Sequence, residues 1–210
     1  MRIPTRRVAA LALVSTLTLA GCGGSDGGSD DTPDTDTSSS TTDAPDDDTD
    51  SEGGDSDQAD GNDIQGTGYS FSLPDGWEVP TQDIPGTEQT DSFAADLTDD
   101  DGFADNVNVI RIDPAPVDDL DQLEDALKAE LEGAGAKDVT VRDRIEVDGE
   151  EAVRVASSQD QQGATYLTEQ VNAIHDGVSY VITFSFSDSV SEGDRDDVAE
   201  SILDTWKWGV

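Results

Sequence analysis

The chain has 210 residues, enough for one ordinary domain with long appendages, and its 49 acidic residues far outnumber its 11 Lys and Arg. The net charge of −38 argues against binding to nucleic acid, because a phosphate backbone needs a basic surface. A single cysteine excludes an intrachain disulfide and a metal site built from several cysteines.

Residues 1–21 are predicted to be a signal peptide. Arg2, Arg6 and Arg7 precede the apolar run from Val8 to Ala20. A basic start followed by a short apolar core and small residues is typical of secretion. Thirteen helical residues reach about 20 Å, which is short of the roughly 30 Å hydrocarbon core of a membrane. The run is therefore a signal core and not a spanning helix.

The end of this segment, Leu19, Ala20, Gly21 and Cys22, resembles the lipobox of bacterial lipoproteins. In that family the cysteine thiol receives a diacylglyceryl group, and cleavage leaves the cysteine as the first residue. The resemblance implies a lipid anchor at Cys22 on the outer face of the cytoplasmic membrane, since two acyl chains hold a protein stably. An ordinary cleavage site beside an incidental cysteine is the alternative. The export route, general or twin-arginine, stays open.

Residues 22–65 are predicted to be a disordered tether. Between Gly23 and Gln65 the sequence has 15 acidic residues, no Lys or Arg, and many Ser, Thr, Gly and Pro. So little apolar surface cannot offset the entropy lost when a chain becomes ordered. Weak calcium binding or glycosylation of this segment are the alternatives to a plain solvated spacer.

Residues 66–210 are predicted to form one domain, and the alternation of apolar and polar residues predicts most of its strands. The strongest strand spans residues 178–186. The other predicted strands are residues 69–73, 92–97, 106–112, 139–147, 152–158 and 166–175. Asp148-Gly149 and Asp176-Gly177 separate neighbouring strands in the way that tight hairpin turns do.

Two segments have helical spacing instead. The first is marked by leucines three or four residues apart: Leu120, Leu123, Leu127 and Leu131. Asp118 or Asp119 is placed to cap its start, and Gly133 and Gly135 are placed to stop it.

The second helix is marked by Val198, Ile202 and Trp206, with Ser191 at its start and Lys207 at its close. Strands joined by hairpins and interrupted by two helices predict an α+β fold. Its central sheet is expected to be mostly antiparallel and flanked by helices.

Three segments of this domain resemble the PsbP-like fold, which LpqN-type lipoproteins of actinobacteria share. They are residues 69–77, YSFSLPDGW, as an opening strand and turn, residues 103–109 as a sheet strand, and residues 202–206 in the closing helix. The resemblance implies an α/β/α sandwich over about residues 66–210. It implies no activity, because members use the scaffold mainly for protein association.

Few residues indicate catalysis. His175 is the only histidine, it ends a predicted strand, and no nucleophile-elbow pattern surrounds the nearby serines. The acidic run from Asp99 to Gly102 lacks the ligand spacing of a calcium loop, and no phosphate-binding loop occurs. We therefore assign no catalytic, cofactor-binding or metal-binding residue.

Trp208 is the candidate partner-binding residue, because tryptophan is enriched at binding hot spots. The sequence predicts a noncatalytic binding or accessory module of the cell envelope, with an extracytoplasmic protein or lipid as its partner. One alternative is a module that binds a small hydrophobic or glycolipid ligand between sheet and helix. Another is a carboxylate-based hydrolase. The sequence predicts no oligomeric state.

Overall fold

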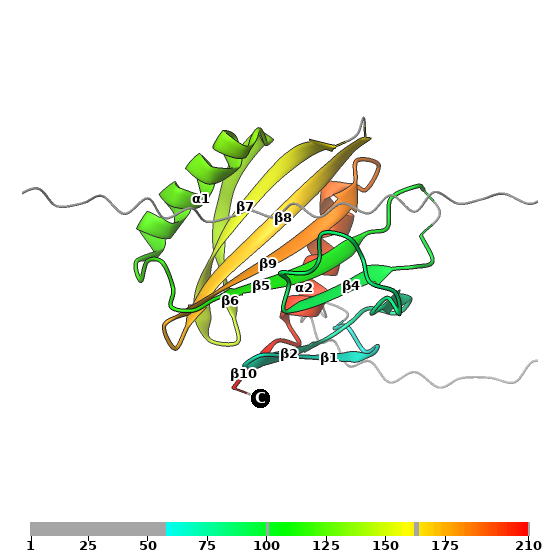
Figure 1. The fold of residues 1–210 in the computed structure, drawn as a ribbon, viewed down its shortest axis with the longest axis horizontal. Helices are drawn as coiled ribbons and strands as arrows, with labels where there is room; N and C mark the ends of the chain where they lie inside the picture. The colour runs from blue at the N-terminus through cyan, green and yellow to red at the C-terminus, as the bar shows by residue number, and fades with distance from the viewer. Residues whose placement is uncertain (1–57, 100, 162–163, 210) are drawn as a thin grey trace, which may run out of the picture. The chain divides into compact units, whose positions relative to one another are not determined.

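The computed structural model describes residues 58–99, 101–161 and 164–209, in which strands and two helices alternate along the chain (Figure 1). Their bounds are β1 Asp63–Gly66, β2 Tyr69–Ser72, β3 Trp77–Glu78, β4 Ser92–Asp96, β5 Asn106–Ile112, α1 Leu120–Ala134, β6 Lys137–Val147, β7 Glu150–Gln161, β8 Ala164–His175, β9 Val178–Ser187, α2 Glu192–Leu203 and β10 Lys207–Trp208. The predicted signal peptide, the lipobox at residues 19–22 and most of the predicted tether lie outside the described residues.

The main sheet has seven strands in the order β3-β4-β5-β9-β8-β7-β6, and neighbouring strands are antiparallel. Its long hairpins turn at the two predicted Asp-Gly pairs. Asp148 and Asp176 have φ values of 45° and 50°, as tight hairpin turns require. The strands predicted at residues 92–97, 106–112 and 178–186 are confirmed with bounds that differ by at most one residue.

Helix α1 packs against β6 and β7 on one face of the main sheet (Figure 1). Asp119 is its N-cap and accepts a hydrogen bond from the Gln122 N–H. Gly135, with a φ of 93°, ends the helix because this left-handed conformation suits glycine. On the packed side, buried Leu123 and Leu131 join Val153 and Val155 of β7.

Helix α2 packs on the opposite face, so helices flank the sheet on both sides and the predicted α+β class is confirmed. Ser191 caps its start by accepting a hydrogen bond from the Asp194 N–H. The prediction that the helix continues to Trp206 and closes at Lys207 is wrong, because the helix ends at Leu203. The hydroxyl of Thr205 donates to the Ile202 carbonyl at this end, and the chain then turns back into a strand.

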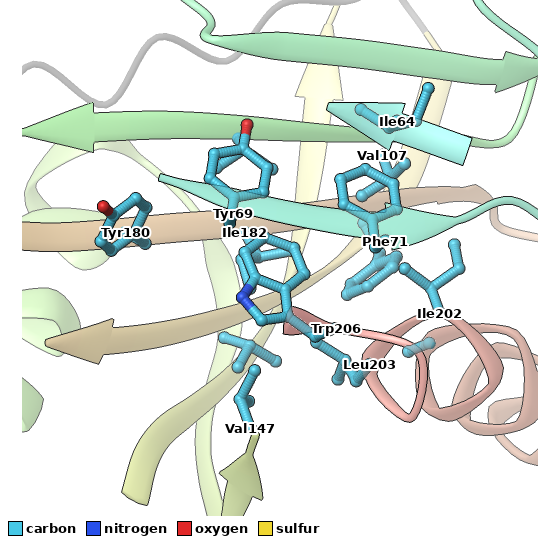
Figure 2. Close-up of a cluster of buried hydrophobic side chains, with 14 of the residues drawn as sticks. Ile64, Tyr69, Phe71, Val107, Val147, Tyr180, Ile182, Ile202, Leu203 and Trp206 are labelled. Carbon is cyan, nitrogen blue, oxygen red and sulfur yellow. The ribbon is translucent and has the colours of Figure 1, made fainter. Parts of the chain in front are cut away.

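A second sheet, in the order β1-β2-β10, packs beside the main one. Figure 2 shows its core, in which the Trp206 ring stacks on Tyr69 and Phe71 with centroid distances of 4.6 and 5.2 Å. This stacking explains why Trp206 leaves the helix: an aromatic cluster buries the indole completely. The short strands β1, β3 and β10 were not predicted.

The predicted boundary at residue 66 is corrected by β1, which begins at Asp63. Its Ile64 is buried in the core opposite Phe71. Further upstream, Ala59 is also buried, and its N–H donates to the Ser201 carbonyl. Two small contributions, the burial of Ile64 and Ala59 and the main-chain pairing, are enough to order this acidic stretch.

Neither helix in the described part of the chain is long and apolar enough to cross a membrane.

Candidate functional site: an uncharged face of the main sheet

The side of β5, β8 and β9 that faces away from α2 carries no charged side chain. We call it the uncharged face. It consists of Asn106, Asn108, Ile110 and Ile112 on β5, Tyr166, Thr168, Gln170, Asn172 and Ile174 on β8, and Ser179, Val181, Thr183, Ser185 and Ser187 on β9. These residues alternate with the core residues along each strand, because successive side chains point to opposite faces.

Strand register arranges these side chains in rows across the sheet. In one row Gln170, Thr183 and Asn108 are neighbours, and in the next row Thr168, Ser185 and Asn106 are neighbours. Residues directly opposite one another on paired strands have Cβ atoms about 5 Å apart. The rows therefore form a continuous layer of hydroxyl and amide groups over three strands.

The absence of charge on this face contrasts with the rest of the domain. Residues 66–210 have 34 acidic and 8 basic residues. The charged side chains of β5 and β8, Arg111 and Glu169, pair in register with Tyr180 and Phe184, so they point to the core side. β9 has no charged residue. One side of three adjacent strands is thus free of charge, and eight of its fourteen side chains are buried.

Several polar groups on the uncharged face have no hydrogen-bond partner. Among the described residues, six buried side-chain atoms lack a partner, and four of them lie here: the Asn106 Oδ1, the Tyr166 hydroxyl and both amide atoms of Asn172. Asn172 is 0% exposed. An unsatisfied buried polar group costs about 1–3 kcal/mol of stability, and these atoms are buried too deeply for a ligand to reach them in the folded domain.

The other polar groups of the face are already engaged or partly accessible. The Gln170 Nε2 donates to the Thr183 hydroxyl at 3.3 Å, and the Thr168 hydroxyl lies 2.7 Å from that of Ser157. Gln170 and Thr183 are only partly buried, so the middle of the face can be reached from solvent. At one end Tyr166 stacks on Phe103, with 5.5 Å between ring centroids.

On the opposite, core side of the sheet, a buried ionic cluster joins α2 to three strands. Glu169 forms an ion pair with Arg154, and Arg154 also reaches Asp196 of α2 at 2.6 Å. Arg142 lies 2.8 Å from the same Asp196 and 3.7 Å from Glu169. Burial raises the pKa of Glu169, against the influence of both arginines. With 2% of its side chain exposed, Glu169 is inaccessible to a substrate, so this cluster is structural.

The candidate Trp208 lies in β10 and makes contacts within the domain. Its ring stacks on His175, with centroids 4.8 Å apart, and its indole N–H donates to the Val147 carbonyl. The His175 Nδ1 lies 2.9 Å from Glu150. These contacts join β10 of the second sheet to the ends of two hairpins of the main sheet, at Val147 and His175, and leave Trp208 only partly exposed. His175 is the last residue of β8, as the sequence analysis expected.

The acidic loop around residues 99–105 lies near Ser187. Asp105 accepts a hydrogen bond from the Ser187 N–H, and Asp101 accepts one from the Ser189 hydroxyl. Burial raises the pKa of Asp105 to about 6, and neighbouring Asp99 and Asp101 add to the rise. Among the residues that the structure describes, no group of three or more His, Cys, Asp or Glu is arranged to hold a metal ion.

The uncharged face was not predicted from the sequence, although the residue types of its strands indicate it. On β5, β8 and β9 most polar residues are Asn, Gln, Ser and Thr, with Arg111, Glu169 and His175 as the exceptions, whereas polar positions elsewhere are often Asp or Glu. The neighbouring placement of β5 and β9 could not be read from the sequence, because α1 and three strands separate them along the chain.

The sequence matches no protein-family profile and no curated protein. Among solved structures, the chain is similar to LpqN of Mycobacterium tuberculosis, involved in cell envelope biogenesis, with a TM-score of 0.49 and 13% identity over 71% of this chain and 86% of that one. It is also similar to CyanoP of Synechocystis, with a TM-score of 0.39 and 19% identity over 70% and 91% of the two chains.

A third similar structure is a protein of Bacteroides thetaiotaomicron, with a TM-score of 0.46 and 11% identity over 70% of this chain. The match spans about half, 48%, of the length of that protein. LpqN and CyanoP belong to the two groups that the sequence resembles, and at these identities the likeness concerns the fold alone.

Proposed function

We propose that this chain is an extracytoplasmic lipoprotein, held on the outer face of the cytoplasmic membrane by acyl chains on Cys22, and that its domain is a noncatalytic binding module. The observation that carries the binding role is the partly exposed middle of the uncharged face, where Gln170 and Thr183 lie side by side without a charged neighbour in their row. The anchor rests on the lipobox at residues 19–22, which directly follows a signal core.

Both parts of the proposal suit the composition of the chain. The segment from Gly23 to residue 57 has no apolar cluster and no basic residue, so it can serve as a spacer. A flexible chain of 35 residues spans roughly 30–35 Å, which keeps the domain clear of lipid headgroups. The strongly acidic domain should repel anionic lipid and wall polymers, and Gln170 and Thr183 lie in the part of the uncharged face that solvent can reach.

The anchor is tested by replacing Cys22. The Cys22→Ala variant cannot carry a thioether, and we expect it to leave the membrane fraction or to accumulate as an uncleaved precursor. Mass spectrometry of the wild-type chain should show a mature product that begins at Cys22 and carries a diacylglyceryl mass.

Ser25→Ala, three residues further along, is the matched control and should fractionate as the wild type does. A Cys22→Ala chain that is processed normally and remains in membranes would contradict the anchor. The binding role is unaffected by that result, because it depends on residues of the main sheet.

A further inference from the structure

A short acidic segment, residues 101–105, is fastened to the end of the main sheet where β8 begins and β9 ends. We call it the strap. Its Asp105 accepts a hydrogen bond from the Ser187 N–H at 2.9 Å, and its Asp101 accepts one from the Ser189 hydroxyl at 2.9 Å. These two contacts join the strap to the last residue of β9 and to the connection that leads into α2.

Between these two acids, the strap packs on β8 through one aromatic ring. The ring of Phe103 stacks on that of Tyr166, with 5.5 Å between their centroids and 13° between their planes. Tyr166 is 2% exposed, whereas Phe103 is only half-buried. The strap therefore lies outermost and covers the end of the uncharged face to which Tyr166 belongs. If the strap moved away, solvent would reach this end of the sheet.

The strap gathers carboxylates without a cation to balance them. Asp101 and Asp105 belong to it, and Asp99 precedes it. Asp96 of β4 donates its main-chain N–H to the Asp105 carbonyl at 2.8 Å. In the described part of the chain none of these four carboxylates forms an ion pair with Lys, Arg or His. The connection after β9 adds only another carboxylate, that of exposed Asp188.

We infer that the strap is sensitive to pH: it closes over Tyr166 in mildly acidic solution and opens as Asp105 loses its proton. Closing brings Asp105 into a half-buried place beside other carboxylates, where a negative charge is disfavoured. A protonated Asp105 avoids this repulsion, and its carbonyl oxygen still accepts the Ser187 N–H. The closed strap therefore holds this proton more tightly than an open strap, in which water surrounds Asp105.

The two acids of the strap set opposite limits to the pH range in which it is closed. Burial raises the pKa of Asp105 to about 6, and the neighbouring carboxylates add to the rise. The part of closure that depends on Asp105 is thus lost as the pH rises through 6. The hydroxyls of Ser187 and Ser189 lower the pKa of Asp101, so its part is lost in more acidic solution, below about pH 4. We expect the strap to be closed most firmly between about pH 4 and pH 6.

The Ser187 N–H reports closure, because it donates to Asp105. Hydrogen-exchange NMR on the full chain carrying Cys22→Ser, which cannot be acylated, gives its protection factor, in which the intrinsic effect of pH on exchange is removed. From pH 5 to pH 7.5 this factor should fall roughly tenfold, as follows from a pKa of 3.8 in the open strap and about 6 in the closed one. The Leu73 N–H, which donates to the Asn62 carbonyl, is the control and should keep its protection factor, since its acceptor does not titrate.

Three variants separate the effect of charge from that of packing. Asp105→Asn keeps an acceptor for the Ser187 N–H but cannot ionise, so its protection factor should be the same at both pH values. Asp101→Asn removes one of the repelling charges and should make the fall smaller than tenfold. Phe103→Ala removes the ring contact and should lower protection about fivefold at both pH values without changing their ratio. Exposed Asp83→Asn is the matched control and should follow the wild type.

Three results would overturn the inference: a Ser187 protection factor that stays constant or rises from pH 5 to pH 7.5, an unchanged pH profile in Asp105→Asn, or a parallel fall at Ser187 and Leu73. The last result would mean that the whole domain opens and not the strap alone. Should Asp105→Asn fail to fold, Asp101→Asn decides, because an undiminished fall in that variant would also overturn the inference. The strap belongs to the domain itself, so these outcomes do not depend on the lipid anchor.

Discussion

At the scale of single residues, buried polar side chains separate into two kinds. Arg154 pairs with Glu169 within the sheet and with Asp196 across the interface between sheet and helix. Asn172 has no partner although none of it is exposed. The first kind is explained by folding alone, because each charge meets its opposite. The second kind costs stability, because the buried amide has lost its hydration without gaining a partner among the described residues.

Asp105 leads to a prediction on pH dependence. Burial raises its pKa from 3.8 to about 6, so the folded protein holds this proton more tightly than the unfolded chain does. The stabilisation of the folded state that comes from this tighter proton binding is complete below about pH 4. It is lost as the pH rises through 6 and Asp105 becomes charged. Asp105→Asn keeps an acceptor for the Ser187 N–H and removes the charge, and it should stabilise the protein by about 1–2 kcal/mol at pH 7.5.

Urea unfolding at pH 4 and pH 7.5 checks this prediction. Asp105→Asn and the wild type should have nearly equal stability at pH 4 and diverge above pH 6. Exposed Asp83→Asn is the control and should follow the wild type at both values. A constant difference between Asp105→Asn and the wild type across this range would contradict the assigned titration.

At the scale of elements, the two helices are attached differently. Helix α1 meets β6 and β7 through a small apolar cluster that includes Leu123 and Leu131. Helix α2 joins the large core through Ala199, Ile202 and Leu203, and the ionic cluster at Asp196 fixes its first turns. The position of α2 therefore depends on charge pairing as well as on apolar packing.

The ionic cluster can be tested by breaking it on one side. Glu169→Leu leaves Arg154 and Arg142 without their buried carboxylate and should reduce the free energy of unfolding by about 3 kcal/mol or more. The double variant Arg154→Met/Glu169→Leu removes both buried charges and should recover part of that loss. Chemical denaturation of the single and double variants measures both effects.

Exposed Glu146→Leu, on β6, is the matched control for this loss and should change stability by less than about 0.5 kcal/mol. If the double variant were less stable than Glu169→Leu alone, the cluster would be net stabilising as a unit, and the expectation of partial recovery would be wrong.

The predictability of these elements follows from their length and pattern. β5 was predicted with its observed bounds, because its seven residues are rich in Val and Ile and begin with a clear polar–apolar alternation. β10 has two residues and pairs with β2 from the far end of the domain, so no local pattern can reveal it. Non-local packing also explains why the predicted end of α2 was wrong. Trp206 fits a four-residue helical spacing with Val198 and Ile202, but its ring packs on Tyr69. The uncharged face likewise depends on the pairing of β5 with β9.

At the scale of the whole molecule, net charge affects both the stability and the solubility of the protein. A chain with a net charge of −38 repels itself, and although six of the eight Lys and Arg in its described part form ion pairs, most of the acidic residues there have no basic partner. Such repulsion destabilises the compact state and is weakened by salt. The same charge keeps copies of the domain apart and favours solubility.

Salt should therefore stabilise the domain. Raising NaCl from about 10 mM to about 1 M shortens the Debye length from roughly 30 Å to 3 Å, and the unfolding temperature should rise by several degrees. KCl at the same ionic strength is the control and should act equally, since screening does not distinguish the two cations. A fall in unfolding temperature with either salt would show that ion pairs outweigh the repulsion.

The pairing of β2 with β10 also governs when the domain can finish folding. A nascent chain emerges from the ribosome or an export channel with Tyr69 and Phe71 well ahead of Trp206. These two rings therefore lack their stacking partner until all strands of the main sheet have emerged. The aromatic core thus closes only after translation or translocation has delivered residues 206–208. Until then, the early strands are exposed to chaperones and proteases.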